Sequence, residues 1–335
     1  IINPVLPNMK IEEFVKNKNK KITFCPGPGS LTKENIQGLA NCFGRGDKEY
    51  IAIEKEVFKK IQDISGQKEV VSFQGSGSLA IEMMFVNFLY GNILVISTGY
   101  YSDRLLAISK KIKKSLNPKI KKIDEVSYKD INKKFKGKYD WVIACPTETS
   151  IGLLLPIKEI SKFSKKINAK LMLDATGSIG LEKNHNLANV ISFSSCKGLF
   201  GLTGASFIAF KDKPKNKVES FYLDINTHLN KGVTGPYHTI LSMHKVLENY
   251  NDFKHSVIVN KNIFMKKMKG FLIHGKKNQP LLCTYVKKKI YSNSKNIILY
   301  SPRSNPENGS VVCHLGELNL KKNSKGKILQ ILRSN

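Results

Sequence analysis

Between residues 68 and 210, short apolar runs rich in β-branched residues alternate with longer stretches of helical periodicity. Strands connected through helices usually run parallel, because each crossover helix packs back onto a face of the sheet. The alternation therefore predicts an α/β fold with three layers around a mostly parallel sheet of seven strands. The expected strands are Glu69–Phe73, Ile93–Ser97, Ile120–Ile123, Trp141–Ala144, Lys170–Asp174, Val190–Ser194 and Ala205–Phe210.

The segments between and beyond these strands complete the expected organisation. The last two strands are too close for a helical crossover, which favours an antiparallel pair. We expect an N-terminal arm at residues 1–20, a large α/β domain at 21–245 and a small C-terminal α+β domain at 246–335. Helices are expected at Leu79–Tyr90, Ser102–Ser115, Tyr128–Phe135 and Ile157–Ile167.

The formal net charge of +29 comes almost entirely from lysine, because the chain has only four arginines. Nucleic-acid sites favour arginine for phosphates and base edges, and these lysines are spread over expected helix faces. We therefore predict solvated surfaces and no nucleic-acid partner, with a charge that would favour anionic substrates. No apolar run is long enough to span a membrane, and no signal peptide is expected. The six cysteines form no CxxC pair and no metal-like cluster, which predicts reduced thiols in a cytoplasmic protein and no metal site.

Polar segments follow several expected strands, and ligands bind at these strand ends in α/β sheets. The first is Gln74–Ser78, which reads QGSGS and precedes a helix. Glycines let backbone amides turn toward a ligand, and a helix start adds a positive dipole, so this segment predicts a phosphate-binding turn. An ordinary loop is the alternative interpretation, with Glu82 as a residue that complements the helix dipole.

The second polar segment is Thr98–Arg104, after the strand expected to end at Ser97. An aromatic ring from Tyr100 or Tyr101 would stack on a planar ligand. Alternatively, both tyrosines line a loop while Ser102 or Asp103 caps the following helix.

The other two segments contribute a carboxylate and an amine. Asp174 ends an apolar strand and needs a cationic partner, either a protonated pyridine nitrogen or a structural ion pair. Lys197 is a lone lysine in a stretch of small and apolar residues, where partial burial would favour the neutral, nucleophilic amine. Each has a structural alternative, but the order of glycine turn, aromatic, aspartate and lysine favours a site.

In this order and spacing, the segments resemble class V aminotransferases of fold type I. Within that class the chain is most similar to 2-aminoethylphosphonate–pyruvate transaminases, and alanine–glyoxylate aminotransferases are more distant. The matching stretches are Cys25–Gly29, Arg45–Tyr50, Gly75–Glu82, Gly99–Arg104, Glu148–Gly152, Asp174–Gly180, Ser194–Gly204, Thr234–Thr239 and Leu315–Glu317. The resemblance implies a transaminase that uses pyridoxal 5'-phosphate (PLP) and forms a homodimer with shared active sites.

The resemblance also implies residue roles. Lys197 would carry PLP as a Schiff base and move a proton during catalysis, and Asp174 would pair with the pyridine nitrogen. Thr234 would reach the phosphate in the neighbouring subunit. The residues implied to bind the cofactor are Ser76, Gly77, Ser78, Tyr101, Thr149, Asp174, Thr176, Ser194, Cys196, Lys197 and Thr234.

One departure from the family lies near the C-terminus. The family has an arginine that binds the substrate carboxylate with two hydrogen bonds, and the aligned position here holds Val311 or a near neighbour. His314 and Arg303 are the substitute candidates for binding substrate. The loss of the arginine indicates a carbonyl acceptor with another anionic group, such as phosphonate or phosphate.

Three functions follow from these features. The first is a PLP-dependent aminotransferase that moves an amino group between a small amine or amino acid, 2-aminoethylphosphonate-like or alanine-like, and a keto acid or aldehyde. The second is a PLP-dependent lyase, which would release product without consuming an acceptor. The third is a non-catalytic basic binding protein, which would ignore PLP and bind nucleic acid with a steep salt dependence.

Overall fold

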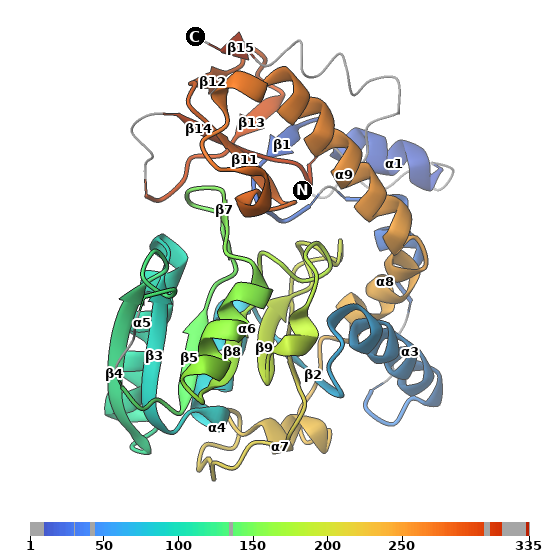
Figure 1. Ribbon diagram of the computed structural model, residues 1–335. Coiled ribbons are helices and arrows are strands. Elements are labelled where there is room, and N and C mark those ends of the chain that lie inside the picture. The colour runs from blue at the N-terminus through green and yellow to red at the C-terminus, as the bar shows by residue number, and fades with distance from the viewer. Residues whose placement is uncertain are drawn as a thin grey trace.

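The computed structural model describes residues 10–29, 31–40, 44–133, 137–304, 309–316 and 333–334. A large twisted sheet forms one part of the molecule, and a group of short strands lies above the ends of its strands in the view of Figure 1. In spatial order the large sheet contains β2 (Glu69–Gln74), β10 (Ala205–Phe210), β9 (Val190–Ser194), β8 (Lys170–Asp174), β5 (Trp141–Ala144), β3 (Gly91–Ser97) and β4 (Ile120–Ser127).

Neighbouring strands of this sheet are parallel except where β10 takes part. The pairs β3–β4, β3–β5, β5–β8 and β8–β9 are parallel. Strand β10 runs antiparallel to both β2 and β9, which leaves β2 parallel to the rest. The expected α/β class, the seven strands and the antiparallel final pair are confirmed.

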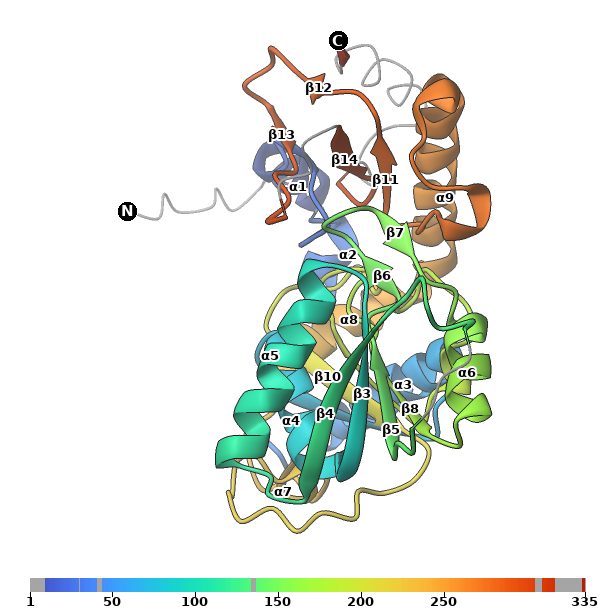
Figure 2. The same cartoon turned by 60° about the vertical axis from the view of Figure 1, so that its left-hand side comes forward.

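Helices cover both faces of the sheet, and each face has its own apolar core (Figure 2). Helix α6 (Ile157–Lys166) is amphipathic: Ile157, Ile160 and Phe163 lie on one side and are buried, while its lysines project outward. Helix α4 (Gly77–Phe88) is buried on nearly every side and accordingly has almost no charged residues. One face carries α4 (Gly77–Phe88), α5 (Tyr100–Ser115) and α7 (Ile225–Leu229); the other carries α3 (Lys48–Ser65), α6 (Ile157–Lys166) and α8 (Tyr237–Glu248).

The helix expected at Tyr128–Phe135 is absent from the described part of that segment. Residues 128–132 form turns, and Phe135 lies outside the described residues. The amide of Lys129 donates to the Ser127 side chain and that of Asp130 donates to the Ser127 carbonyl. These local hydrogen bonds give the backbone an alternative to a helix.

The remaining elements come mostly from the two ends of the chain. Strand β1 pairs in parallel with β13, so a segment from the start of the chain joins the C-terminal strands in space. Residues 11–18 of the expected arm form a helix, and the expected domain boundaries stay a prediction. The elements are α1 (Ile11–Lys18), β1 (Ile22–Phe24), α2 (Lys33–Gln37), β6 (Thr147–Glu148), β7 (Leu153–Leu154), α9 (Tyr250–Lys267), β11 (Cys283–Val286), β12 (Ile290–Tyr291), β13 (Ile297–Leu299), β14 (Ser310–Cys313) and β15 (Arg333–Ser334), with 3-10 turns at His185–Leu187, Lys269–Phe271 and Lys276–Asn278.

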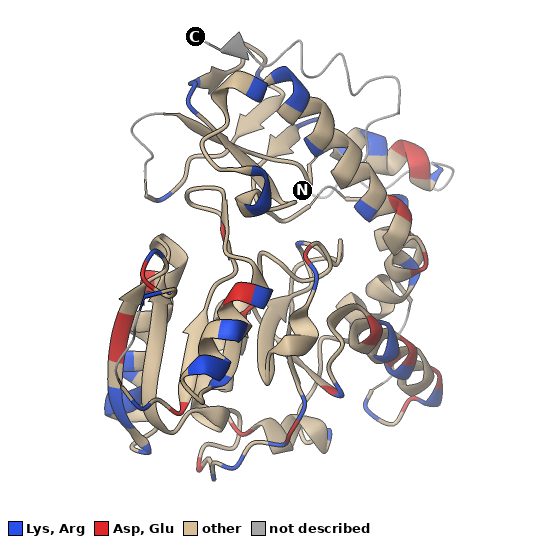
Figure 3. Cartoon of the chain, viewed as in Figure 1, with Lys and Arg blue, Asp and Glu red and all other residues tan. Residues whose placement is uncertain are grey.

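The basic side chains are distributed over many elements. In the view of Figure 3, Lys and Arg occur on α3, α6, α9 and β4 and alternate with Asp and Glu on several of them. Among the described helices, none combines the length and the apolar character that crossing a membrane requires.

Candidate active site

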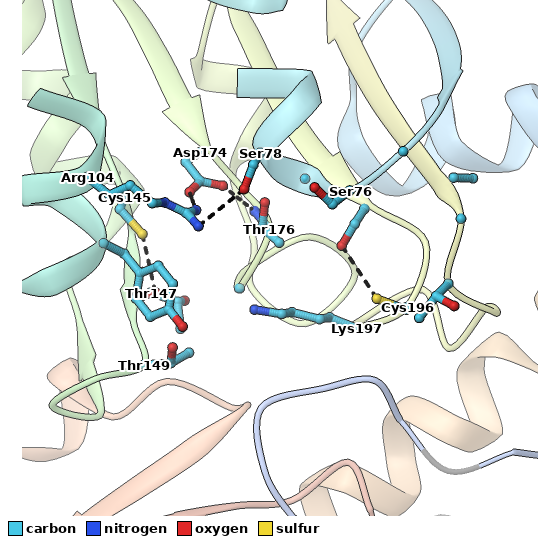
Figure 4. A pocket seen from close by; sticks show the side chains of 18 residues that line it. Ser76, Ser78, Arg104, Cys145, Thr147, Thr149, Asp174, Thr176, Cys196 and Lys197 are labelled. Carbon is cyan, nitrogen blue, oxygen red and sulfur yellow. Dashed lines mark hydrogen bonds and ion pairs between the residues drawn. The ribbon is translucent and has the colours of Figure 1, made fainter. Parts of the chain in front are cut away.

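Loops at the carboxyl ends of the central strands surround a cavity of about 390 Å³ (Figure 4). Ten of the residues that the sequence assigned to the site line this one cavity. They are Ser76, Gly77, Ser78, Tyr101, Thr149, Asp174, Thr176, Ser194, Cys196 and Lys197. The other lining residues are Gly75, Arg104, Cys145, Thr147, Gly177, Thr203, Gly204 and Ala205.

The glycine turn after β2 forms one wall. The amide of Gly75 donates to the carbonyl of Gly204 at 3.0 Å, which ties this turn to the start of β10. Ser76 is the N-cap of α4, and its side chain makes no capping hydrogen bond. A Cβ at Gly77 would lie 3.0 Å from Oγ1 of Thr176, so a larger residue here would require the Thr176 side chain to move by a few tenths of an ångström. The Ser76 hydroxyl is thus available to a ligand at a helix start, where anions are favoured.

Asp174 lies at the end of β8, and its side chain is only 2% exposed. Its Oδ1 accepts the amide of Thr176 at 3.0 Å, which fixes the carboxylate at the cavity wall. A buried carboxylate needs cationic compensation, and Arg104 provides it, with Nη2 3.6 Å from Oδ2.

Lys197 projects into the cavity from the tight loop between β9 and β10 (Figure 4). The loop is held at several points: the amide of Phe200 donates to the Lys197 carbonyl at 2.9 Å, and that of Gly29 donates to Cys196 at 3.1 Å. Nζ of Lys197 lies 5.8 Å from the ring centroid of Tyr101. The amine and the Tyr101 ring therefore border the same space.

Two further residues organise the site and were not assigned by the sequence. Glu148 is fully buried, and its Oε2 accepts the backbone amides of Tyr101 at 3.0 Å and Ser102 at 3.4 Å. Burial raises the pKa of Glu148, and hydrogen bonds from Ser150 oppose that shift. Glu148 thus anchors the start of α5 and with it the Tyr101 ring. Arg104 is the second residue, and its position within the TGYYSDR segment was the only available signal.

Three residues assigned from the sequence do not line the cavity: His314, Thr234 and Arg303. The assignment of His314 to substrate binding is wrong. His314 is fully buried; its Nε2 lies 3.0 Å from Oγ1 of Thr284, and its ring packs 5.5 Å from Phe264, so it cannot bind substrate in this cavity. Thr234 lines an adjoining groove that shares Gly75 and Gly204 with the cavity. Arg303 is exposed and lies at the start of α5, where its Nη1 donates to the Tyr100 hydroxyl at 2.9 Å.

The cavity wall contains polar atoms that need a ligand. Within the described part of the chain, Oγ1 of Thr147, Oγ1 of Thr176 and Nε of Arg104 are buried without a hydrogen-bond partner. Buried polar atoms are nearly always satisfied in folded proteins. A polar, planar and phosphate-bearing group such as PLP fits these atoms together with the glycine turn, the carboxylate and the amine. The described residues contain no cluster of His, Cys, Asp and Glu that would hold a metal ion.

Comparison with known proteins gives a consistent result. A family model described as Aminotransferase class-V matches residues 10–231. The chain is 25% identical over 257 residues to a 2-aminoethylphosphonate–pyruvate transaminase of Pseudomonas putida strain GB-1, and the alignment covers 70% of each protein. It is 27% identical over 267 residues to a bifunctional phosphonoacetaldehyde hydrolase/aminoethylphosphonate transaminase of Clostridioides difficile, covering 72% of this chain and 42% of that one.

Solved structures with the same fold are more distant in sequence. An alanine–glyoxylate aminotransferase from Nostoc sp. superposes with a TM-score of 0.77 at 15% identity, covering 99% of this chain and 96% of that one. A phosphoserine aminotransferase from Cytophaga hutchinsonii gives a TM-score of 0.75 at 14% identity, with 93% and 98% coverage. At these identities the match establishes the fold.

Proposed function

Because the chain belongs to the class-V aminotransferase family, whose members use PLP, we propose that it transfers an amino group between a small amine or amino acid and a keto acid or aldehyde. The observation that carries this proposal is the presence of Lys197, Asp174 and the glycine turn around one cavity. When bound, PLP supplies an aldehyde that accepts the amine and a ring that accepts electrons. The protein must bind it, orient it and move protons.

Each wall of the cavity has a part in this function. Nζ of Lys197 would hold the cofactor covalently and then move a proton to and from Cα of the substrate. The Asp174 carboxylate would keep the ring nitrogen protonated. The Tyr101 ring would pack on the face of the cofactor, and Ser194 and Cys196 would border its phosphate. The start of α4, with Ser76, Gly77 and Ser78, would bind the phosphate itself.

The residue aligned with the family's carboxylate-binding arginine lies on the C-terminal strand β14, outside the set of residues that line the cavity. Val311 is 2% exposed and belongs to an apolar cluster with Tyr285 and Cys313, against which Ile151 and Tyr300 pack. This cluster offers no cation for a carboxylate. Both sequence relatives described above carry names that refer to aminoethylphosphonate. We therefore propose a donor of the 2-aminoethylphosphonate or alanine type, with Arg303 at the start of α5 as the candidate contact for an anionic group.

A homodimer with shared sites and a cytoplasmic location complete the proposal. The resemblance to class V aminotransferases implies that Thr234 reaches the phosphate in the neighbouring subunit, and in this chain Thr234 lines a groove beside the cavity. Cys283 and Cys313 lie opposite each other across β11 and β14 and are nevertheless free thiols, as expected in a reducing compartment.

The test is to follow the visible absorbance of the PLP-loaded enzyme while single amines are added. We expect the colour of lysine-linked PLP in the purified or reconstituted protein, its bleaching by 2-aminoethylphosphonate, alanine or glutamate, and its return when a carbonyl acceptor is added. Lys197→Ala should bind PLP without the covalent link. A protein that ignores PLP would refute the proposal. Release of ammonia without use of an acceptor would indicate a lyase.

A further inference from the structure

Arg104 projects from α5 into the cavity and contacts two of its walls (Figure 4). Its Nη2 lies 3.6 Å from Oδ2 of Asp174, and its Nη1 lies 3.4 Å from Oγ of Ser78. The guanidinium carbon lies 5.0 Å from the ring centroid of Tyr101. Its side chain is 27% exposed. Arg104 therefore lies beside the carboxylate rather than at the cavity mouth.

Among the charged residues around the cavity, Asp174 is the carboxylate that forms an ion pair with Arg104. The other buried carboxylate nearby, Glu148, is occupied by the backbone amides of Tyr101 and Ser102 and by the Ser150 side chain. Lys197 is the second cation that lines the cavity. Of these two cations, Arg104 is the one with a nitrogen within ion-pair distance of Asp174, so this nearly inaccessible carboxylate depends on Arg104 for compensation.

We propose that Arg104 shares the charge of Asp174 with the ring nitrogen of PLP and so sets how firmly that nitrogen holds its proton. This inference rests on the proposed function. The protonated nitrogen and the guanidinium are both positive and compete for one carboxylate. Arg104 therefore weakens protonation of the ring, and it compensates Asp174 when the cofactor is absent. Arg104 is accordingly a positioning residue, because it acts on the cofactor through Asp174.

A charge-removing substitution separates this role from simple packing. Arg104→Met keeps an apolar stem against Tyr101 but leaves Asp174 without its cation. Arg104→Gln, a second variant, keeps a hydrogen-bond donor, and Arg104→Lys keeps the charge. Arg303→Met is the matched control, because Arg303 also lies over a tyrosine, 5.4 Å from the Tyr100 ring centroid, but does not line the cavity.

The experiment measures dissociation constants of the cofactor-stripped enzyme for PLP and for an analogue whose ring nitrogen is replaced by carbon. With its competitor removed, Asp174 should favour PLP over the analogue more strongly in Arg104→Met and Arg104→Gln than in the unmodified enzyme. We expect the preference to increase about 5- to 100-fold, the usual range for coupled sites. Arg104→Lys and Arg303→Met should keep the original preference.

A second readout uses the cofactor-free protein. Arg104→Met should lower its melting temperature, and PLP should raise that temperature by more than it does in the unmodified protein. If both charge-removing variants lose PLP and analogue affinity equally, the proposed charge sharing is wrong and Arg104 serves only packing. If the unmodified protein binds neither compound, the proposed function fails, and this inference fails with it.

Discussion

Gly198 lies where the lysine loop touches the loop that follows Asp174. A Cβ at Gly198 would overlap the carbonyl oxygen of Ile179 and would lie 2.8 Å from Cγ of Leu181. Carbon–oxygen contacts normally begin near ~3.3 Å, so the two backbones would have to separate by about 1 Å. Gly198→Ala therefore forces apart the loops that hold Lys197 and Asp174.

The loss of stability in Gly198→Ala depends on the atom that the added methyl group would overlap, the backbone oxygen of Ile179. Overpacking usually costs about 1–3 kcal/mol, and a backbone carbonyl cannot rotate away as a side chain can, so we expect about 3 kcal/mol for Gly198→Ala. Gly180, on the opposite loop, reinforces the contact, because its φ of +74° and the nearby backbone of Gly198 leave it no room for a side chain. The contact is thus close from both sides.

Two measurements test this prediction. Thermal unfolding of the cofactor-free protein should show a midpoint lowered by roughly 4 °C, because the unfolding entropy scales with chain length. Affinity for PLP should fall at least about tenfold, because a displacement near 1 Å moves Lys197 relative to Asp174. Gly29→Ala is the matched control: Gly29 also borders the lysine loop, but nothing lies within 4 Å of its added Cβ. Equal stability and equal PLP affinity in both variants would refute the reasoning.

Three further predictions concern buried polar groups. Burial lowers the pKa of His185 from 6.5 to about 4, so below pH 6.5 the unfolded chain binds a proton that the folded protein does not bind. The free energy of unfolding should therefore fall between pH 6.5 and 4, by at most about 3 kcal/mol. Urea unfolding measured across this pH range should show a smaller fall in His185→Gln. Burial lowers the pKa of Lys261 from 10.5 to about 8, so stability should rise between pH 8 and 10.5, and Lys261→Met should abolish that rise; a persistent rise would assign it elsewhere. Nδ2 of the Asn117 side chain donates to the carbonyls of Phe85, Val86 and Leu89. Asn117→Ala should therefore cost about 1–3 kcal/mol in thermal unfolding, and an unchanged midpoint would mean that these carbonyls find other donors.

The sequence predicted the sheet and most of the cavity because both depend on local patterns. Apolar runs marked the strands, and ligands gather at strand ends for reasons of topology. Arg104 and Glu148 escaped prediction because charged residues near a helix start or a strand end usually interact with solvent or with a helix dipole. Their orientation toward the cavity is set by the packing of α5 against the sheet, which the sequence pattern does not reveal.

The error at His314 has a simpler cause. Side chains alternate between the two faces of a strand. Val311 and Cys313 share one face of β14 and contact Tyr285, whereas Val312 packs on the other face, in the cluster that contains Phe264. His314 continues the second face and packs on Phe264. A residue three positions after Val311 therefore lies on the opposite face of the strand from Val311.

The place of β2 at the edge of the sheet has a consequence for synthesis on the ribosome. In the described sheet the only strand paired with β2 is β10, which emerges more than a hundred residues later. At a translation rate of about 5–20 residues per second, the apolar strand β2 remains unpaired for on the order of ten seconds before β10 is synthesised. Until then the glycine turn lacks its hydrogen bond to Gly204, and the nascent chain can neither bind PLP nor bury β2. The yield of active enzyme should therefore depend on chaperones that shield this segment during translation.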